Sequence, residues 1–295
     1  MKAFNKTRLF FYSIPLAGIV FIRFHWYFDV VKAHNLLFKI QPVFPISFFE
    51  THYLYVFAHL FAFIPVLFLS FDKKVAYYKQ WRFVFPAIFI VAVPFWIWDI
   101  AKTDAGVWGF NPDYYTRLLI NLPIEEWLFF ITFPWASVFI YLCLNAYFPL
   151  KISTNETRAL ENEKNGSLFF LFDNDNLFTG LLIFFFFVIA LIFWGHLYTV
   201  TTFSAAGFVL LWQFVCGNKM VRINFYRMFP IATIPFILIN SVFTGAFTHA
   251  PIVVYNPEEY IGIRFFTIPL DDFAYNFLLT FSVVVIYDWF SMKTI

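Results

Sequence analysis

Charged side chains are scarce in this sequence. Only 13% of its 295 residues are Asp, Glu, Lys or Arg, whereas 61% are hydrophobic. Soluble domains carry about a quarter charged residues, so this composition indicates a protein whose solvent is lipid. The net charge is only +2, and the basic residues are scattered rather than gathered in a patch. We therefore expect no nucleic-acid partner, because such a partner requires a concentrated basic surface.

The sequence also lacks the motifs of common cofactor and metal sites. Its two cysteines, Cys143 and Cys216, lie in separate apolar stretches, so neither a disulfide framework nor a zinc site is expected. The ten glycines form no G-x-G-x-x-G motif for a dinucleotide. The six histidines are not clustered as in a di-iron enzyme, and no prenyltransferase-type aspartate motif occurs. No lysine lies inside an apolar run to form a retinal Schiff base, so we expect no metal and no cofactor.

Long apolar runs, by contrast, recur along the whole chain. A membrane-spanning helix needs about 20 mostly apolar residues. The first run resembles a signal peptide, but no small-x-small cleavage site follows, so we interpret it as a retained helix. Seven spans remain an alternative to eight. The sequence thus predicts an all-α integral membrane protein with helices at 9–27, 53–71, 83–100, 124–147, 177–195, 198–216, 228–245 and 268–290.

The distribution of Lys and Arg predicts the orientation. Most of these residues fall in the segments that eight helices would place on one face. Because cytoplasmic loops carry an excess of positive charge, this face is expected to be cytoplasmic, with both termini on it. The basic segments are 1–8, 72–82, 148–176, 217–227 and the C-terminus.

An internal repeat divides the chain. Residues 111–130 and 256–277 both begin with Asn-Pro, pass a short amphipathic stretch and reach Pro-Ile-Glu-Glu or Pro-Leu-Asp-Asp before an apolar run. The pattern predicts two parallel four-helix repeats, each with its acidic motif on the non-cytoplasmic side. We assign residues 1–149 to the first half and 177–295 to the second. The polar segment 150–176 is predicted to be a cytoplasmic linker.

The two acidic motifs are the main candidate site residues, namely Glu125, Glu126, Asp271 and Asp272. Proline followed by acids is also an ordinary helix start, because the acids favour the positive end of the helix dipole. Here, however, the flanks of the first motif are wholly apolar and the motif occurs twice. Acids within the membrane boundary are by default a functional-site hypothesis.

Further polar and aromatic residues accompany the acids. Asp99 follows Trp96-Ile97-Trp98 at the predicted end of the third helix, and Asn240 takes the corresponding place in the second half. Aromatic rings stabilise cations by about 0.5–2 kcal/mol per contact, although most of the 48 Phe residues must simply face lipid. The aromatic residues expected to lie near the acids are Trp98, Trp108, Trp127 and Tyr275.

Several motifs resemble those of the heterodimer-type lycopene cyclases of carotenoid-making bacteria and of the cyclase half of fungal bifunctional carotenoid enzymes. The likeness covers about residues 53–290 and looks like the fused, single-chain form. Residues 1–52, including the extra helix, fall outside it. The family motif is Pro-x-Glu-Glu/Asp, from which Asp271 departs by one methylene group. The resemblance is carried by residues 70–74, 94–99, 106–112, 122–130, 255–257, 262–264 and 268–272.

The resemblance implies the acid-catalysed, redox-neutral cyclisation of lycopene ends to β-rings, giving γ- and then β-carotene. It implies Glu125 as the main acid, Glu126 and Asp99 as its partners or base, and Asp271 with Asp272 as a second set. It further implies a bacterial inner-membrane location, lycopene and lipid as partners, and other carotenoid-pathway enzymes as candidate partners. The residues assigned to substrate binding are Trp98, Trp108, Trp127, Asn111, Asn240, Asn256, Arg264 and Tyr275.

Other functions remain open at this point. A cyclase of C50 carotenoids or one that forms another ring isomer would share these motifs. A proton-coupled transporter would also combine parallel repeats with membrane acids, but transport sites lie near the midplane, whereas both acid pairs begin helices near one face. A non-catalytic carotenoid-binding subunit is a further alternative.

Overall fold

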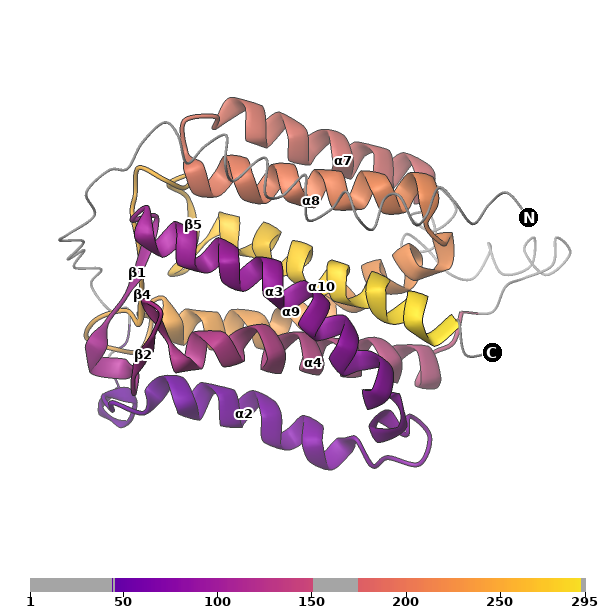
Figure 1. Cartoon of the computed structure of the whole chain (residues 1–295), viewed down its shortest axis with the longest axis horizontal. Helices are drawn as coiled ribbons and strands as arrows, with labels where there is room; N and C mark the ends of the chain where they lie inside the picture. Colours follow the sequence, from indigo (N-terminus) through magenta and orange to yellow (C-terminus); the bar gives the residue numbers. More distant parts are fainter. Residues whose placement is uncertain (1–43, 45, 151–174, 293–295) are drawn as a thin grey trace, which may run out of the picture.

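Seven α-helices packed side by side form the described part of the chain (Figure 1). The computed structural model describes residues 44, 46–150 and 175–292. The predicted helix at 9–27 and nearly all of the predicted linker at 150–176 lie outside these residues. The α-helices are α2 (Leu54–Leu69), α3 (Trp81–Asp104), α4 (Ile124–Tyr147), α7 (Asp175–Ile192), α8 (Leu197–Cys216), α9 (Lys219–Phe243) and α10 (Leu270–Met292).

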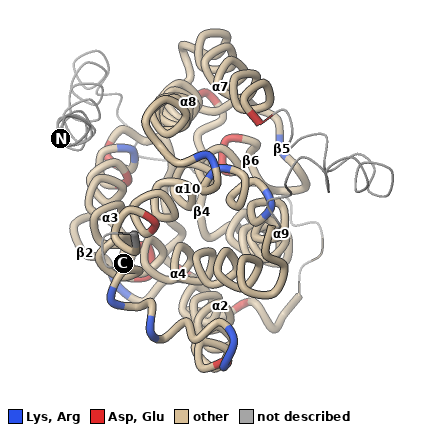
Figure 2. The backbone as a smooth tube through the Cα atoms, turned by 90° about the vertical axis from the view of Figure 1, so that its right-hand side faces the viewer, with Lys and Arg blue, Asp and Glu red and all other residues tan. Residues whose placement is uncertain are grey.

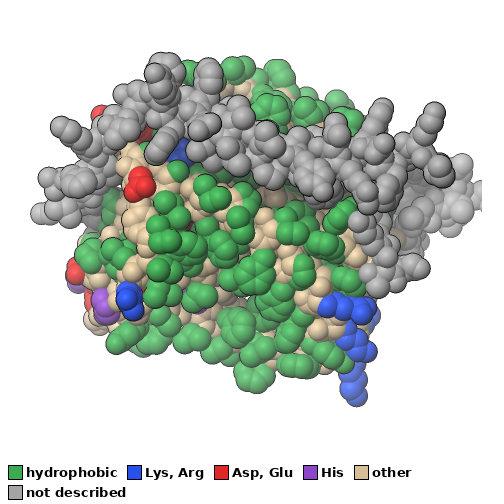
Figure 3. All heavy atoms as spheres, in the orientation of Figure 1, with side chains coloured by type: hydrophobic (Ala, Val, Ile, Leu, Met, Phe, Trp, Pro, Cys, Tyr) green, Lys and Arg blue, Asp and Glu red, His purple; other side chains and the backbone are tan. Residues whose placement is uncertain are grey.

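The predicted membrane fold is confirmed. Six of the described helices are long and apolar enough to cross a membrane, and α2 is a shorter apolar helix. Hydrophobic side chains cover the side of the bundle, while Lys and Arg side chains gather at the end where α2 turns into α3 (Figure 3). Exposed residues such as Phe61, Ile90, Leu128 and Ile234 contribute to this apolar surface. Such residues are expected to face lipid.

Short strands close the other end of the bundle. Strand β1 (Trp108–Phe110) pairs antiparallel with β4 (Val253–Tyr255). Two small hairpins, β2 (Leu118–Leu119) with β3 (Leu122–Pro123) and β5 (Arg264–Phe265) with β6 (Ile268–Pro269), lead directly into α4 and α10. These hairpins lie in the short amphipathic stretches that precede the two acidic motifs in the sequence.

The two halves repeat the same order of elements in parallel. α2, α3, β1, a hairpin and α4 in the first half correspond to α8, α9, β4, a hairpin and α10 in the second. The β1–β4 pairing is centred on Gly109 opposite Val254, so each half contributes one equivalent strand to it. α3 packs against α10, and α9 packs against α4, so each half contacts the other through its long helices. Seen end-on, α4 and α10 occupy the middle of the bundle, with α2 and α7 at opposite margins (Figure 2).

Two predicted helix ends are wrong. α9 begins at Lys219 rather than at 228, because the Asn218 side chain caps it by accepting the Met220 N–H at 2.9 Å. The predicted loop 217–227 is therefore mostly helix, and its Arg222 is buried in an ion pair with Asp175. α3 likewise continues to Asp104, so Asp99 lies inside this helix instead of ending it.

Candidate active site

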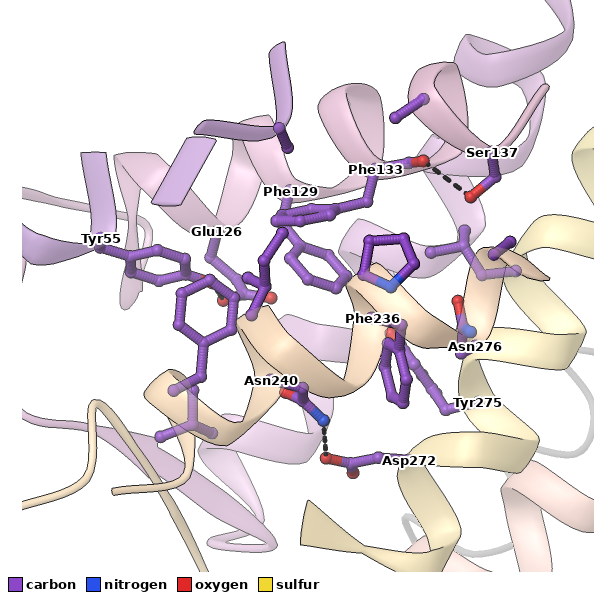
Figure 4. A pocket seen from close by; sticks show the side chains of 18 of the residues that line it. Tyr55, Glu126, Phe129, Phe133, Ser137, Phe236, Asn240, Asp272, Tyr275 and Asn276 are labelled. Carbon is purple, nitrogen blue, oxygen red and sulfur yellow. Dashed lines mark hydrogen bonds between the residues drawn. The ribbon is translucent and has the colours of Figure 1, made fainter. Parts of the chain in front are cut away.

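A cavity of about 300 Å³ lies inside the bundle near the strand end (Figure 4). This volume falls at the lower end of the range for small-molecule sites. Its walls come mainly from α2, α4, α9 and α10 and are mostly apolar and aromatic. Three carboxyl groups reach it, those of Asp99, Glu126 and Asp272.

The first polar cluster is built around Glu126. The Tyr55 hydroxyl donates a hydrogen bond to Glu126 Oε2. The Asp99 carboxyl group lies beside the Glu126 carboxyl group in the same cavity. Trp108 Nε1 donates to Asp99 Oδ1 at 2.7 Å. Two neighbouring carboxyl groups in an apolar cavity repel each other when both are ionised, so the pair favours the state in which one of them carries a proton. The Asp99–Glu126 pair is therefore arranged to hold a proton inside the cavity.

The second polar cluster is built around Asp272. Its carboxyl group accepts hydrogen bonds from Tyr198 Oη at 2.7 Å, Asn240 Nδ2 at 2.8 Å and Tyr255 Oη at 2.9 Å. Figure 4 shows the contact with Asn240. Tyr255 lies in β4, outside the membrane-spanning helices, and burial together with the adjacent Asp272 raises its pKa well above the ordinary value. Three neutral donors around one carboxyl group suit an ionised carboxylate.

The two clusters are related by the repeat but are not equal. Tyr55 and Tyr198 are each the second residue of their helix, and each donates to the second acid of the adjacent motif. In the first cluster a second carboxyl group, that of Asp99, lies beside Glu126, whereas in the second an amide, Asn240, donates a hydrogen bond to Asp272. The first cluster is thus an acid pair, and the second is a single carboxyl group held by donors.

The first acid of each motif does not line the cavity. Glu125 Oε1 accepts hydrogen bonds from Thr116 N at 2.9 Å and from Thr116 Oγ1 at 2.6 Å. Asp271 accepts from Ile261 N at 3.2 Å and from the Thr199 hydroxyl. Adjacent helix residues point about 100° apart, so the two acids of one motif face different surroundings. Glu125 and Asp271 tie the preceding segments to α4 and α10.

Three of the residues predicted to bind substrate line the cavity, namely Trp108, Asn240 and Tyr275. The Tyr275 ring lies 6.4 Å from the Trp108 ring and 6.0 Å from the Trp98 ring, centroid to centroid. Trp98 packs behind Tyr275 and is not part of the cavity wall. The cavity thus has an aromatic wall beside the carboxyl groups.

The other four predicted substrate-binding residues also lie outside the cavity and make hydrogen bonds to the segments that connect the helices. Trp127 Nε1 donates to Leu119 O at 3.1 Å. Asn111 and Asn256 each accept, at 3.1 Å, the backbone N–H two residues further along. Arg264 donates to Tyr260 Oη at 3.0 Å and to the Thr267 carbonyl. Among the described residues, no three or more His, Cys, Asp or Glu side chains come together as a metal site.

Tyr55 and Tyr198 were missed by the sequence reasoning. Both hydroxyls contact cavity carboxyl groups, and both residues follow a leucine at the start of a helix. The sequence feature that could have identified them is the Leu-Tyr pair at the start of both α2 and α8. It becomes visible only once α2 and α8 are recognised as equivalent.

Fold and cavity together define an integral membrane protein with a carboxyl-bearing, largely apolar cavity. The family model for lycopene cyclase matches residues 52–144 and 195–290, one region in each half. The chain belongs to the lycopene cyclase family, as its motifs indicated. No curated protein and no solved structure gives a significant match to the chain.

Proposed function

We propose that the protein is a lycopene β-cyclase that converts the ψ-ends of lycopene to β-rings by acid catalysis without net redox change. The observation that carries this proposal is the pairing of Asp99 with Glu126 in the same apolar cavity as the separate carboxyl group of Asp272. Membership of the lycopene cyclase family supports the substrate class. The excess of Lys and Arg in the polar connections supports a cell-membrane location with cytoplasmic termini.

The reaction begins with proton transfer from the acid pair. Glu126, with Asp99 behind it, protonates the terminal double bond of a ψ-end. An internal double bond then attacks the resulting cation, which closes the ring and moves the positive charge into it. Glu126 takes the role that the sequence motif assigned to Glu125, because Glu125 is bound to Thr116 outside the cavity.

The reaction ends with proton removal. The Asp272 carboxylate accepts a proton from the ring carbon next to the cation, and the C–H electrons form the ring double bond. One proton enters the substrate and one leaves it, so the product is an isomer and no oxidant is needed. The Asp272 proton must then return to the acid pair before the next turnover.

The cavity wall suits the cationic intermediate. Phe129, Trp108 and Tyr275 present aromatic rings beside the carboxyl groups, and each such ring can stabilise a cation by about 0.5–2 kcal/mol. The scarcity of water in an apolar cavity protects the cation from being trapped as an alcohol.

Expression of the full chain in a lycopene-accumulating bacterium tests the proposal. The expected result is replacement of lycopene by γ- and β-carotene, identified by chromatography. The Glu126→Gln variant should lose conversion by about 10²–10⁴-fold, because a positioned acid typically contributes that factor. Unchanged lycopene, with the wild-type protein present in the membrane, would contradict the proposal.

A further inference from the structure

We propose that the cavity opens sideways to lipid between α2 and α9 and that this opening holds the polyene chain behind the reacting end. This inference rests on the proposed function and adds the route and the binding place of the chain. We call the part of the cavity between Phe61, Ala62, Pro65, Ala136, Pro235 and Phe236 the apolar arm.

Two residues of α2 mark the mouth of the apolar arm. Phe61 and Pro65 line the cavity, yet both are exposed on the outside of the bundle, and Phe61 is 66% exposed. The cavity therefore reaches the outer side of the bundle at these two side chains, and we place its mouth there. Both residues lie in the middle or second half of α2, away from the polar ends. The mouth therefore faces the apolar surface that contacts lipid.

The arrangement of the helices explains the opening. α2 and α9 each pack against α4, but they are not among the helix pairs in close contact with each other. At the strand end the gap is closed by the Tyr55 and Phe243 rings, whose centroids are 4.6 Å apart. Farther along, Ala62 of α2, Ala136 of α4 and Ala232 of α9 contribute only methyl groups to the wall.

The dimensions of the arm fit a long apolar chain. Tyr55, beside the acids, and Pro65, at the mouth, are ten residues apart on one helix, which corresponds to about 15 Å. The hydrocarbon core of a bilayer is about 30 Å thick. A chain that leaves the acids through the arm therefore enters lipid near the middle of the bilayer, where a polyene dissolves.

The polarity of the arm also fits such an occupant. Ser137 and Asn276 are the polar residues of the cavity wall away from the acids. The Ser137 hydroxyl donates to the Phe133 carbonyl at 3.0 Å, so it is already paired (Figure 4). A polyene has no polar group to offer, and it would leave this hydrogen bond intact.

Tryptophan substitutions in the arm test the proposal. Ala62→Trp and Ala136→Trp narrow the arm, and Leu60→Trp is the matched control, because Leu60 is an exposed residue of α2 that does not line the cavity. Each full-length variant is assayed with lycopene and with a short terpene that has the same ψ-end. Both arm variants should lose lycopene conversion by about tenfold or more relative to the short substrate, because overfilling an apolar site is costly. The control should convert both substrates like the wild type.

The results distinguish failure of the arm proposal from failure of the proposed function. Arm variants that convert lycopene like the wild type would overturn the proposal, and so would an equal loss for both substrates. If the wild type itself leaves lycopene unchanged, the proposed function fails. The proposal that the arm binds the polyene chain is then tested separately, by the amount of lycopene that the purified protein retains, measured by visible absorption. In that case Ala136→Trp should retain less lycopene than Leu60→Trp, and equal retention would refute the arm.

Discussion

At the scale of single residues, the difference between Asp99 and Asn240 is the feature that separates the two clusters. Asp99→Asn would make the first cluster resemble the second, with an amide beside the acid. Because an amide cannot share or relay a proton as a carboxyl group does, we expect lycopene turnover to fall by about tenfold or more. The measurement is initial turnover in isolated membranes at equal protein level. Unchanged turnover would show that Glu126 acts without Asp99.

Glu125 provides the contrasting prediction. Glu125→Gln can still accept the Thr116 hydrogen bonds, so turnover should stay within a few-fold of the wild type. Glu125→Ala leaves a backbone N–H without its acceptor, which should lower the free energy of unfolding by about 1–3 kcal/mol. Thermal unfolding in detergent and turnover are measured together. A stable Glu125→Gln protein without turnover would make Glu125 the acid and refute our assignment of Glu126.

The sequence could identify the acidic motif but not the acid within it. Glu125 and Glu126 have the same chemistry and the same apolar flanks, and the apolar residues around them show no single buried face. Only the position of Thr116 shows that one of the two acids is bound outside the cavity. Tyr55 and Tyr198 were likewise indistinguishable from the other tyrosines among sixteen, since their role depends on contacts 71 and 74 residues away.

At the scale of elements, the first turn of α8 is held from two sides. Lys102 Nζ of α3 donates to the Leu197 carbonyl at 3.0 Å, and Glu259 accepts the Leu197 N–H at 2.8 Å. Glu259 lies outside the membrane-spanning helices, and its burial raises its pKa. This attachment positions Tyr198, the next residue, against Asp272. We therefore predict that Lys102 is a positioning residue that acts on the site through α8.

Lys102→Met should release this attachment. We expect kcat to fall by roughly tenfold or more while the KM for lycopene stays similar, because a displaced Tyr198 disturbs Asp272 and not the apolar arm. Lys102→Arg keeps a donor for the Leu197 carbonyl and serves as the control. An unchanged kcat in Lys102→Met, or equal losses in both variants, would contradict the positioning role.

Element boundaries were predictable where the apolar run ended cleanly. α4 begins and ends as predicted, because Pro123 and the polar linker bound its apolar run. The start of α9 was predicted nine residues too late, because its first turns carry Lys219, Arg222 and Arg227 and resemble a loop. Its structure depends on tertiary contacts, above all the buried Arg222–Asp175 ion pair at 2.8 Å. The β1–β4 pairing joins the two halves and has no local signal at all.

At the scale of the whole molecule, neither half can form the cavity alone. α3 packs on α10, α9 packs on α4, and the cavity takes carboxyl groups from both halves. We therefore expect residues 1–149 and 150–295, expressed as two separate chains, to be inactive singly and to restore conversion when co-expressed. Pigment analysis in the lycopene-accumulating strain provides the measurement. Conversion by either half alone would mean that each half contains a complete site.

The shared cavity further predicts one composite site instead of two independent ones. If Glu126 donates the proton and Asp272 removes one, both act on the same substrate end, and each end is cyclised in a separate visit. Glu126→Gln and Asp272→Asn should then each reduce total conversion by about 10²–10⁴-fold. Two independent sites would instead leave roughly half of the activity in either variant, because the untouched cluster would continue to work. In the wild type, γ-carotene should form first and decline as β-carotene rises, since the half-cyclised chain must leave through the mouth between α2 and α9 and return with its other end.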